Sequence, residues 1–227
     1  MDSIFNNVKG EILHFLLSHK NEFKTILEIG THFGNDTLEL KKIFPSSEIF
    51  CFEPDPRNIK IISKNWNGRQ VAYLYELAIS NINGKTKFHL SSGDCSSWTN
   101  DQLWSKNDWS ASSSLKEPKN HLNTHPWITF DSSVDVNCIR LDDFEPLKNK
   151  TIDFIWMDVQ GAEDLVFQGA TNTLKKTKYI FTEYDNGELY AGQLSLNDMI
   201  NVLGPDWEVI NIFENDVLLK NNNYENI

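Results

Sequence analysis

Hydrophobic positions along this chain follow two periodicities that alternate with each other. Short apolar runs predict buried strands at residues 25–29, 48–52, 71–78, 152–158 and 179–184. Apolar residues three or four positions apart, helped in one case by an initial proline, predict helices at residues 3–19, 35–44, 56–65, 162–176 and 194–203. Strands that alternate with helices in this way predict an α/β sandwich with a mostly parallel sheet.

Two turns predict antiparallel pairing. Asn83-Gly84 is typical of a hairpin turn, and residues 87–91 would form the returning strand. Residues 207–213 and 216–220 predict a terminal hairpin, which leaves residues 221–227 as a frayed tail.

One stretch breaks both periodicities: residues 92–133 form a polar insertion rich in Ser and Trp. It contains Trp98, Trp104, Trp109 and Trp127. An indole face fits the C–H face of a sugar ring, and Trp109 is our predicted substrate contact. The same side chains could instead anchor the segment to the core as a lid, because burying an indole removes a large apolar area from water. Both alternatives stay open at this stage.

The composition is that of one globular domain over residues 1–227. A net charge of −11, from 21 basic and 32 acidic residues, disfavours nucleic acid or an anionic membrane as the main partner. No apolar run is long enough to span a bilayer, and the N-terminus lacks a signal-type core, so we expect a cytoplasmic protein. Three widely spaced cysteines predict neither a disulfide framework nor a zinc motif.

The residues that could carry chemistry begin at the end of the first predicted strand. Glu28 precedes Gly30 and Gly34, and Glu53 ends the second predicted strand. Glycines let the backbone approach a ligand and carboxylates accept hydrogen bonds from hydroxyls and amines, so these strand ends predict a nucleoside pocket. A dinucleotide fingerprint needs glycine where His32 stands, and the charge of Glu28 would repel a pyrophosphate. The pattern favours S-adenosylmethionine, with its cationic ammonium and sulfonium and with ribose hydroxyls for Glu53 to accept.

Further carboxylates are predicted at neighbouring strand ends. Asp158 ends the strand expected beside the first one, at the topological switch point where α/β sheets bind ligands, and Glu183 ends the next strand. Asp158 could act as a general base, orient a substrate hydroxyl or hold a metal. Glu163 either caps the helix that follows Gly161 or points into the site. Several carboxylates in one place are costly unless the ligand carries positive charge or hydrogen-bond donors.

The histidines have more than one interpretation. His32 could remove a proton near the methyl group or contact the methionine part of the cofactor, and it could equally pack against the first helix. His121 and His125 have the i,i+4 spacing of a zinc pair on a helix, but Pro126 follows them and no third ligand is evident. We therefore predict no metal site, while a divalent cation held by Asp158 stays an alternative.

Five motifs occur in one order along the chain. They are Glu28-Ile29-Gly30-x-x-x-Gly34, Phe52-Glu53-Pro54-Asp55-Pro56, Leu77-Ala78-Ile79-Ser80, Leu141-Asp142-Asp143-Phe144 and Asp158-Val159-Gln160-Gly161-Ala162-Glu163. Together they resemble the FkbM family of S-adenosylmethionine-dependent methyltransferases, which have the Rossmann-like class I methyltransferase fold. The resemblance covers roughly residues 25–184. It implies a seven-stranded sheet flanked by helices, and methylation of hydroxyls on sugars or polyketides.

Matching positions carry the family's roles onto this sequence. Gly30 and Gly34 match its cofactor loop. Glu53 matches the ribose acid, and Asp158 matches the acid beneath the methyl group. The cofactor-binding residues implied in this way are Glu28, Gly30, Thr31, Phe33, Gly34, Glu53, Pro54, Ala78, Ile79, Ser114 and Asp158. The sequence departs from the pattern at Gln160, where the family's usual motif has glutamate.

We therefore predict an S-adenosylmethionine-dependent methyltransferase that methylates a hydroxyl on a carbohydrate or a related small molecule. Asp158 or His32 would remove the hydroxyl proton at or after transfer, and Trp109 and Glu183 would face the substrate. Two alternatives stay open, namely a catalytically silent glycan-binding module on the same fold and an NAD-dependent sugar-modifying enzyme.

Overall fold

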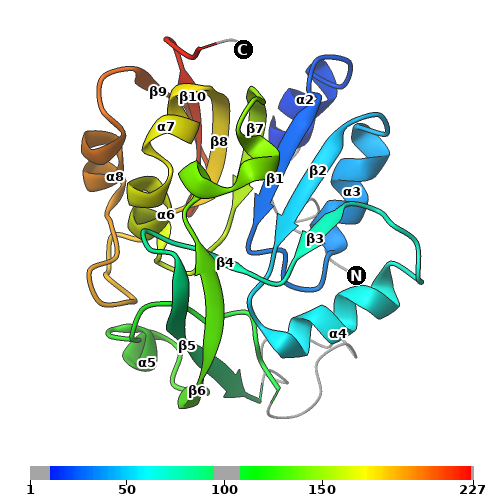
Figure 1. The fold of residues 1–227 in the computed structure, drawn as a ribbon. Coiled ribbons are helices and arrows are strands. Elements are labelled where there is room, and N and C mark those ends of the chain that lie inside the picture. The colour runs from blue at the N-terminus through cyan, green and yellow to red at the C-terminus, as the bar shows by residue number, and fades with distance from the viewer. Residues whose placement is uncertain (1–10, 95–107, 226–227) are drawn as a thin grey trace.

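A seven-stranded sheet forms the centre of the structure, a computed structural model that describes residues 11–94 and 108–225 (Figure 1). The strand order is β3-β2-β1-β7-β8-β10-β9, in which five parallel strands are followed by an antiparallel hairpin. The strands are β1 Thr25–Ile29, β2 Glu48–Phe52, β3 Tyr73–Tyr75, β7 Ile152–Met157, β8 Thr177–Glu183, β9 Trp207–Ile212 and β10 Asp216–Asn221. This sheet confirms the predicted α/β sandwich with its terminal hairpin.

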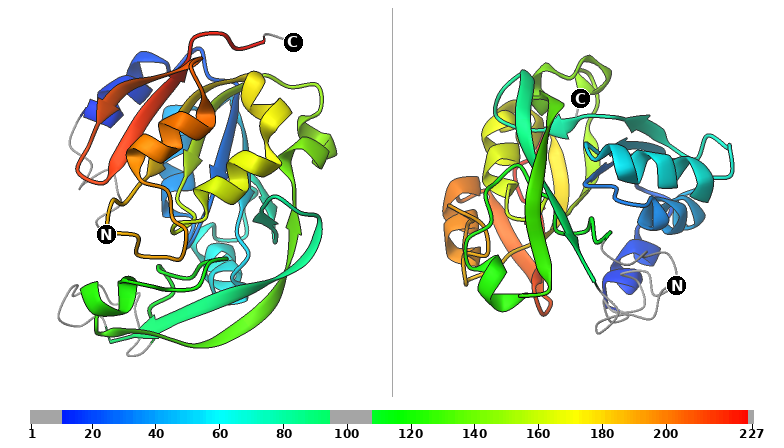
Figure 2. Two further views of the ribbon diagram at one scale, coloured as in Figure 1. Left: turned by 90° about the vertical axis from the view of Figure 1, so that its left-hand side faces the viewer. Right: turned by 90° about the horizontal axis from the view of Figure 1, so that it is seen from below.

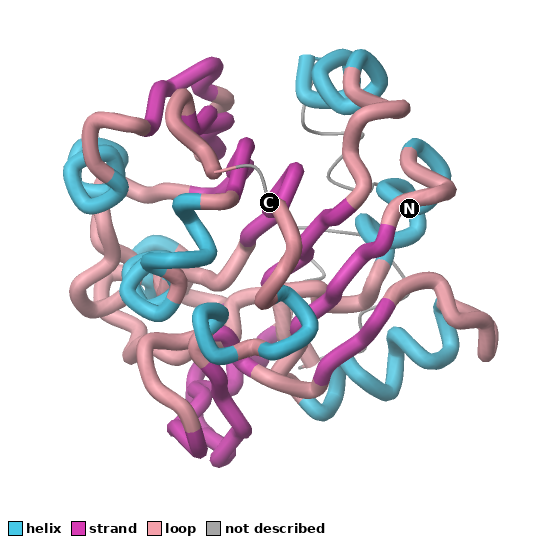
Figure 3. Tube along the Cα trace, turned by 45° about the horizontal axis from the view of Figure 1, so that its top comes forward, coloured by secondary structure: helices cyan, strands magenta, loops and turns pink. Residues whose placement is uncertain are grey.

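Helices cover both faces of the sheet (Figure 3). They are α2 Glu11–Ser18, α3 Asn35–Ile43, α4 Pro56–Asn65, α6 Glu163–Gly169, α7 Thr171–Lys175 and α8 Leu196–Leu203. One hydrophobic core lies under α2, α3 and α4, and the other lies under α6, α7 and α8. Side chains of β1 alternate between the two cores, since Ile26 belongs to the first and Leu27 and Ile29 belong to the second.

A second, three-stranded sheet has the order β4-β6-β5. It consists of β4 Ala78–Ile79, β5 Gly84–Gly93 and β6 Ile128–Ile139, and the short helix α5 His121–Thr124 lies between β5 and β6 in the chain. Two 3-10 turns, η2 Leu141–Asp143 and η3 Glu145–Leu147, lead from β6 to β7. Figure 2 shows the long β5–β6 pair crossing beneath one end of the main sheet. This arrangement lets the second sheet wall a site at that end.

The predicted hairpin at Asn83-Gly84 is wrong. β6 lies between β4 and β5, so β5 pairs antiparallel with β6 from Gly84 to Gly93 and does not pair with the preceding strand. The small apolar core of this sheet explains the arrangement, because Val136 of β6 is buried in the same cluster as Ala78 and Phe88. A turn signal reports only local geometry, whereas this pairing is decided by residues fifty positions away.

Three further predicted boundaries differ from the structure. The single strand at 71–78 is two strands, β3 and β4, which lie in different sheets. The helix at 162–176 divides at Ala170 into α6 and α7. The polar insertion at 92–133 is narrower than expected, because β5 and β6 extend into both of its ends. Their polar sequence reflects strands that are exposed along much of their length.

The two ends of the chain also refine the predictions. Of the N-terminal helix predicted at 3–19, Glu11–Ser18 is observed and its first residues lie outside the described part. The predicted fraying at 221–227 is wrong for residues 221–225, because Asn221 belongs to β10 and its amide donates to Leu174 O at 3.1 Å. The backbone N–H of Glu225 also donates to Lys175 O. No helix within the described residues is long and apolar enough to cross a membrane.

Candidate functional site

A cavity of about 1590 Å³ lies where the carboxyl ends of β1, β2, β7 and β8 face the second sheet. This is the switch-point edge at which open α/β sheets bind ligands. The predicted site residues that line it are Gly30, Thr31, His32, Phe33, Glu53, Pro54, Ala78, Ile79, Trp109, Asp158 and Glu183. Glu28, Gly34 and Ser114 are not among its lining residues. The structure thus brings most of the predicted residues to one cavity.

Gly30 allows the loop after β1 to lie directly against the end of β7. Its φ of 91° is in the region that favours glycine, and a Cβ at this position would lie 1.8 Å from the backbone oxygen of Asp158. The Asp158 N–H donates to Ile29 O at 2.9 Å, and the Gly30 N–H donates to Phe52 O at 2.9 Å. Gly30 therefore lets β1, β2 and β7 meet at the cavity with no side chain between them.

Glu53 ends β2 inside the cavity and binds the loop after β1. Its Oε2 accepts from the His32 backbone N–H at 2.7 Å, and its Oε1 accepts from Asp55 N at 2.8 Å and from Asn58 Nδ2 at 3.2 Å. Burial raises the pKa of Glu53 to about 8 although these hydrogen bonds oppose the shift. Oε1 thus already accepts two hydrogen bonds, whereas Oε2 keeps one further lone-pair site, so a ligand hydroxyl that donates to Oε2 would favour the ionised form.

His32 lies in this loop with a left-handed backbone (φ 52°), which is costly for a residue other than glycine. Its ring stacks on Phe33 with centroids 3.8 Å apart, and its Nε2 lies 3.2 Å from Ser110 Oγ. Ser110 donates its own hydrogen to Asn58 Oδ1 at 2.7 Å, so His32 Nε2–H is the donor to Ser110. Burial lowers the pKa of His32 to about 4, which leaves the ring neutral near pH 7.

Glu28 points away from the cavity, toward α3. Side chains alternate along β1, and the Glu28 carboxylate accepts from the Thr37 hydroxyl and from Cys51 Sγ at 3.3 Å. Burial raises its pKa to about 8. The sequence correctly predicts an acid next to the loop, but the pleat of β1 directs its carboxylate to Thr37 and Cys51 and not into the cavity.

Gly34 and Ser114 also support the cavity from outside. Gly34 has a φ of 72°, and a Cβ there would lie 2.6 Å from Trp66 Nε1, which donates to Gly34 O at 3.1 Å. Ser114 is fully buried, and its hydroxyl donates to Gln160 O at 2.8 Å. The first contact fixes the start of α3, and the second joins the segment around Ser114 to the turn after β7.

The ionisation of Glu28 should make the protein less stable as the pH rises. Its pKa is near 4.5 when unfolded and about 8 when folded, so its contribution is complete below about pH 4.5 and is lost as the pH rises through about 8. Since one pKa unit corresponds to about 1.4 kcal/mol, the loss reaches at most about 5 kcal/mol. The free energy of unfolding, measured with urea from about pH 5 to about pH 8, should fall less steeply with pH for Glu28→Gln than for the wild type. Equal slopes for Glu28→Gln and the wild type would contradict this expectation. Glu22→Gln, at an exposed position, is the control and should have the slope of the wild type.

Acidic side chains dominate the charge of the cavity. Among its described lining residues are five acids and neither Lys nor Arg; the acids are Asp36, Glu53, Asp158, Glu183 and Asp185. The sequence did not single out Asp36, which lies in the first turn of α3. Burial and then the charge of Asp158 raise the pKa of Asp36 to about 7, and its buried Oδ1 has no hydrogen-bond partner among the described residues. A carboxylate in this position favours a ligand that brings a donor or a positive charge.

Aromatic side chains from the insertion form the opposite wall. Trp109 is buried, its Nε1 donates to Ser112 Oγ at 3.0 Å, and its ring lies edge-on to Trp127 with centroids 5.1 Å apart. His121 and His125 also line the cavity, with ring centroids 5.1 Å apart. Trp109 thus both anchors the insertion and lines the cavity. Trp98 and Trp104 lie outside the described residues.

The described residues contain no group of three or more His, Cys, Asp or Glu side chains arranged to hold a metal ion. The prediction of a metal-free site stays a prediction. Burial lowers the pKa of His121 to about 4, with a further contribution from His125.

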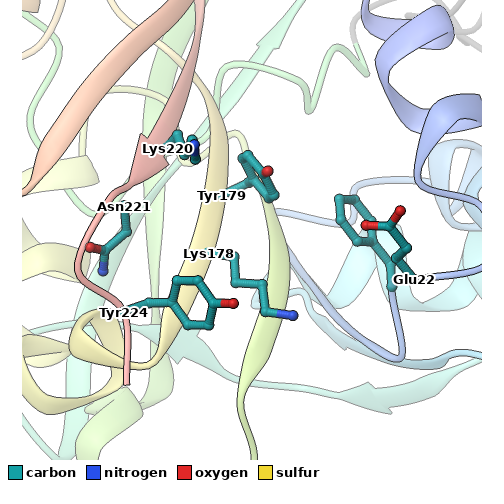
Figure 4. A pocket seen from close by; sticks show the side chains of 7 residues that line it. Glu22, Lys178, Tyr179, Lys220, Asn221 and Tyr224 are labelled. Atoms are coloured by element: carbon teal, nitrogen blue, oxygen red, sulfur yellow. The ribbon is translucent and has the colours of Figure 1, made fainter. Parts of the chain in front are cut away.

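A smaller hollow of about 310 Å³ lies elsewhere on the molecule (Figure 4). Glu22, Lys178, Tyr179 and Tyr224 are among the residues around it. Lys178 is already paired with Asp153 at 2.7 Å and lies over the Tyr224 ring. The hollow lies at the start of β8, whereas the large cavity lies at the end of that strand, so the two are separate.

A comparison with known families matches the Methyltransferase FkbM domain to residues 28–222 of this chain. The chain belongs to this family. NoeI, a 2-O-methyltransferase of Sinorhizobium fredii (strain NBRC 101917 / NGR234), is 41% identical over 201 residues, which cover 86% of this chain and 79% of NoeI. The predicted family membership is confirmed.

Solved structures of methyltransferases resemble this FkbM protein only loosely. The N-methyltransferase NodS from Bradyrhizobium japonicum WM9 has a TM-score of 0.48 and 11% identity, and the match covers 99% of each chain. An rRNA methylase from Streptococcus thermophilus has a TM-score of 0.46 and 10% identity, with 93% of this chain and 95% of the other covered. Values this low give no information about substrate.

As an FkbM methyltransferase, the protein has S-adenosylmethionine as its cofactor and the Rossmann-like class I methyltransferase fold. The cavity fits this cofactor. Its acids suit the sulfonium and ammonium charges, the unpartnered Oδ1 of Asp36 can accept from a donor, and Oε2 of Glu53 can accept from one hydroxyl.

Asp36, Asn58, Ser110 and Tyr190 are among the lining residues that sequence reasoning missed. Asp36 had a usable signal, since it lies two positions after the second loop glycine. The fold brings Asn58 into contact with Glu53 and Ser110 into contact with His32. Tyr190 reaches the site from a loop after β8. Nothing in the local pattern of these three residues distinguishes them from ordinary polar or aromatic positions.

Proposed function

We propose that this FkbM methyltransferase transfers a methyl group to a hydroxyl of a carbohydrate or a related small molecule. The observation that carries the proposal is one cavity with two unlike halves. Acids at the strand ends suit a cationic cofactor, and the Trp109–Trp127 wall suits the C–H face and hydroxyls of a sugar. The 41% identity to a 2-O-methyltransferase supports transfer to oxygen.

The cofactor would lie along the ends of β1, β2 and β7. Oε2 of Glu53 would accept from a ribose hydroxyl, while Pro54, Ala78 and Ile79 would pack beside the adenine. The loop Gly30–Phe33 would follow the methionine part, where Asp36 would accept from its ammonium. Three predicted residues lie outside the cavity lining and would support these elements without contacting the cofactor, namely Glu28, Gly34 and Ser114.

The cofactor supplies an activated methyl group, and the protein's own residues place the acceptor hydroxyl and take up its proton. Positioning supplies much of the rate in such a displacement. We assign proton uptake to Asp158, since the carboxyl lies in the cavity at the end of β7. His32 is less suited, because its Nε2–H is a donor to Ser110 and its lowered pKa makes it a weak base.

The two alternative functions predict different binding. A silent glycan-binding module would bind its glycan without methyl transfer, and an NAD-dependent enzyme would bind NAD and change nicotinamide absorbance. We propose a small-molecule acceptor and not a nucleic acid, in line with a net charge of −11. We propose the cytoplasm as the site of action. Calorimetry with S-adenosylmethionine and NAD, followed by mass spectrometry of a panel of glycosides and oligosaccharides, separates these cases. NAD binding without S-adenosylmethionine binding would overturn the proposal.

Trp109→Ala should impair acceptor binding and spare cofactor binding. Losing the indole removes a stacking surface worth about 1 kcal/mol or more, so the KM for a glycan acceptor should rise about 5- to 10-fold. The Kd for S-adenosylmethionine, measured by calorimetry on the same sample, serves as the internal control and should be unchanged. An unchanged acceptor KM with a folded variant would show that Trp109 only anchors the insertion.

A further inference from the structure

Gln160 joins two carboxylates at the cavity. It lies in the turn between β7 and α6 with a left-handed backbone (φ 52°). Its side-chain Nε2 donates to Asp158 Oδ1 at 2.7 Å and to Glu183 Oε2 at 3.0 Å. Asp158 follows β7 and Glu183 is the last residue of the neighbouring parallel strand β8, and all three side chains line the cavity. A single amide group therefore connects the ends of β7 and β8.

The remaining contacts of Gln160 fix the orientation of that amide. The Tyr190 hydroxyl has one hydrogen, which it shares between Ser112 O at 2.7 Å and Gln160 Oε1 at 3.1 Å. Tyr190 is only 1% exposed. An amide flipped by half a turn would place its oxygen against two carboxyl groups, of which an ionised one has no hydrogen to donate. The donor side of Gln160 is thus directed at Asp158 and Glu183.

We propose that Gln160 is a positioning residue that holds Asp158 and Glu183 as one proton-sharing carboxyl pair, and that this pair takes up the proton of the acceptor hydroxyl. The proposal rests on the proposed O-methyl transfer. The acceptor oxygen forms the new bond to the methyl carbon, and the electrons of the old carbon–sulfur bond stay on sulfur. The hydroxyl proton passes to the ionised carboxylate of the pair, so charge and atoms balance.

The electrostatics around the pair agree with a shared proton. Burial raises the pKa of Asp158, and burial together with the Asp158 charge raises the pKa of Glu183 well above its usual range. The titratable groups that face the pair from the packed elements are Asp36 of α3, Glu163 of α6, Asp216 of β10 and the phenol of Tyr190. All of them are acids. The two N–H donors of Gln160 therefore offset part of this repulsion and favour the ionised form.

Carbon-13 NMR of the carboxyl groups of the full chain tests the pairing without an acceptor. Asp158→Asn and Glu183→Gln assign the two signals. In the wild type we expect two coupled steps, with the upper step above the range of an ordinary carboxyl. In Gln160→Met, which keeps the length and removes the donors, both steps should move up by about one pH unit or more. Gln168→Met, at an exposed position of α6, should titrate like the wild type.

The same variants give a second readout once a glycoside acceptor is methylated. The acid limb of the kcat/KM profile for the acceptor, which reports the pKa values of the free enzyme, should move upward in Gln160→Met by the same amount, with an unchanged KM for S-adenosylmethionine. Independent titration of Asp158 and Glu183, or a Gln160→Met titration equal to that of the wild type, would overturn the positioning role. Coupled titration without methylation of any hydroxyl acceptor would instead overturn the proposed function.

Discussion

Replacing Glu53 with alanine should weaken S-adenosylmethionine binding by about 10- to 100-fold. The free site on Oε2 would accept from a ribose hydroxyl, and a hydrogen bond to a charged group contributes about 1.5–3 kcal/mol. The change also leaves the His32 N–H, the Asp55 N–H and the Asn58 amide without their acceptor, which loosens the loop after β1. Isothermal titration calorimetry with S-adenosylmethionine measures the change directly.

A control on the same strand separates this effect from a general effect of lost charge. Glu48 begins β2, and its half-exposed side chain pairs with Lys150 at 2.6 Å. Glu48→Ala should bind S-adenosylmethionine like the wild type. Comparable affinity for Glu53→Ala and Glu48→Ala, with both proteins folded by circular dichroism, would show that Glu53 does not hold the ribose.

Gly30→Ala should destabilise the protein by about 3 kcal/mol or more. A methyl group at this position would lie 1.8 Å from the backbone oxygen of Asp158 and would overlap it. The alanine would also have to adopt a φ of 91°. Overpacking against backbone typically costs about 1–3 kcal/mol, and the left-handed conformation adds about 1–2 kcal/mol. Because β1 and β7 must separate to make room, cofactor binding should be lost as well. Urea unfolding and calorimetry measure the two effects.

Gly68→Ala provides the matched control for backbone strain. Gly68 also has a positive φ, 69°, but a Cβ there would meet nothing within 4 Å. Gly68→Ala should therefore lower the free energy of unfolding only by the cost of the left-handed backbone, about 1–2 kcal/mol, and should leave S-adenosylmethionine binding unchanged. Equal losses for Gly30→Ala and Gly68→Ala would show that β1 and β7 can separate at Gly30 at no cost.

The elements that the sequence predicted well are those whose pattern is local. β1, β2 and β7 are short apolar runs buried on both faces, and Glu53 and Asp158 follow directly from the ends of such runs. The order of parallel strands then brought these two acids to one edge of the sheet, because parallel strands share the direction of their carboxyl ends.

The elements that the sequence predicted poorly depend on distant partners. The pairing of β5 with β6 is decided by burial across the chain, and no turn signal contains that information. Glu28 was assigned to the cavity although the pleat of β1 directs it to Thr37. The contact between Gln160 and Tyr190 joins residues thirty positions apart, so it becomes visible only in the folded chain.

A crystal structure of the protein with S-adenosylhomocysteine tests the central claim most directly. We predict a ribose hydroxyl on Oε2 of Glu53, the adenine beside Ala78 and Ile79, and the sulfur facing the Asp158–Gln160–Glu183 group. Density for the ligand outside this cavity, or inside it with the ribose turned away from Glu53, would contradict the account.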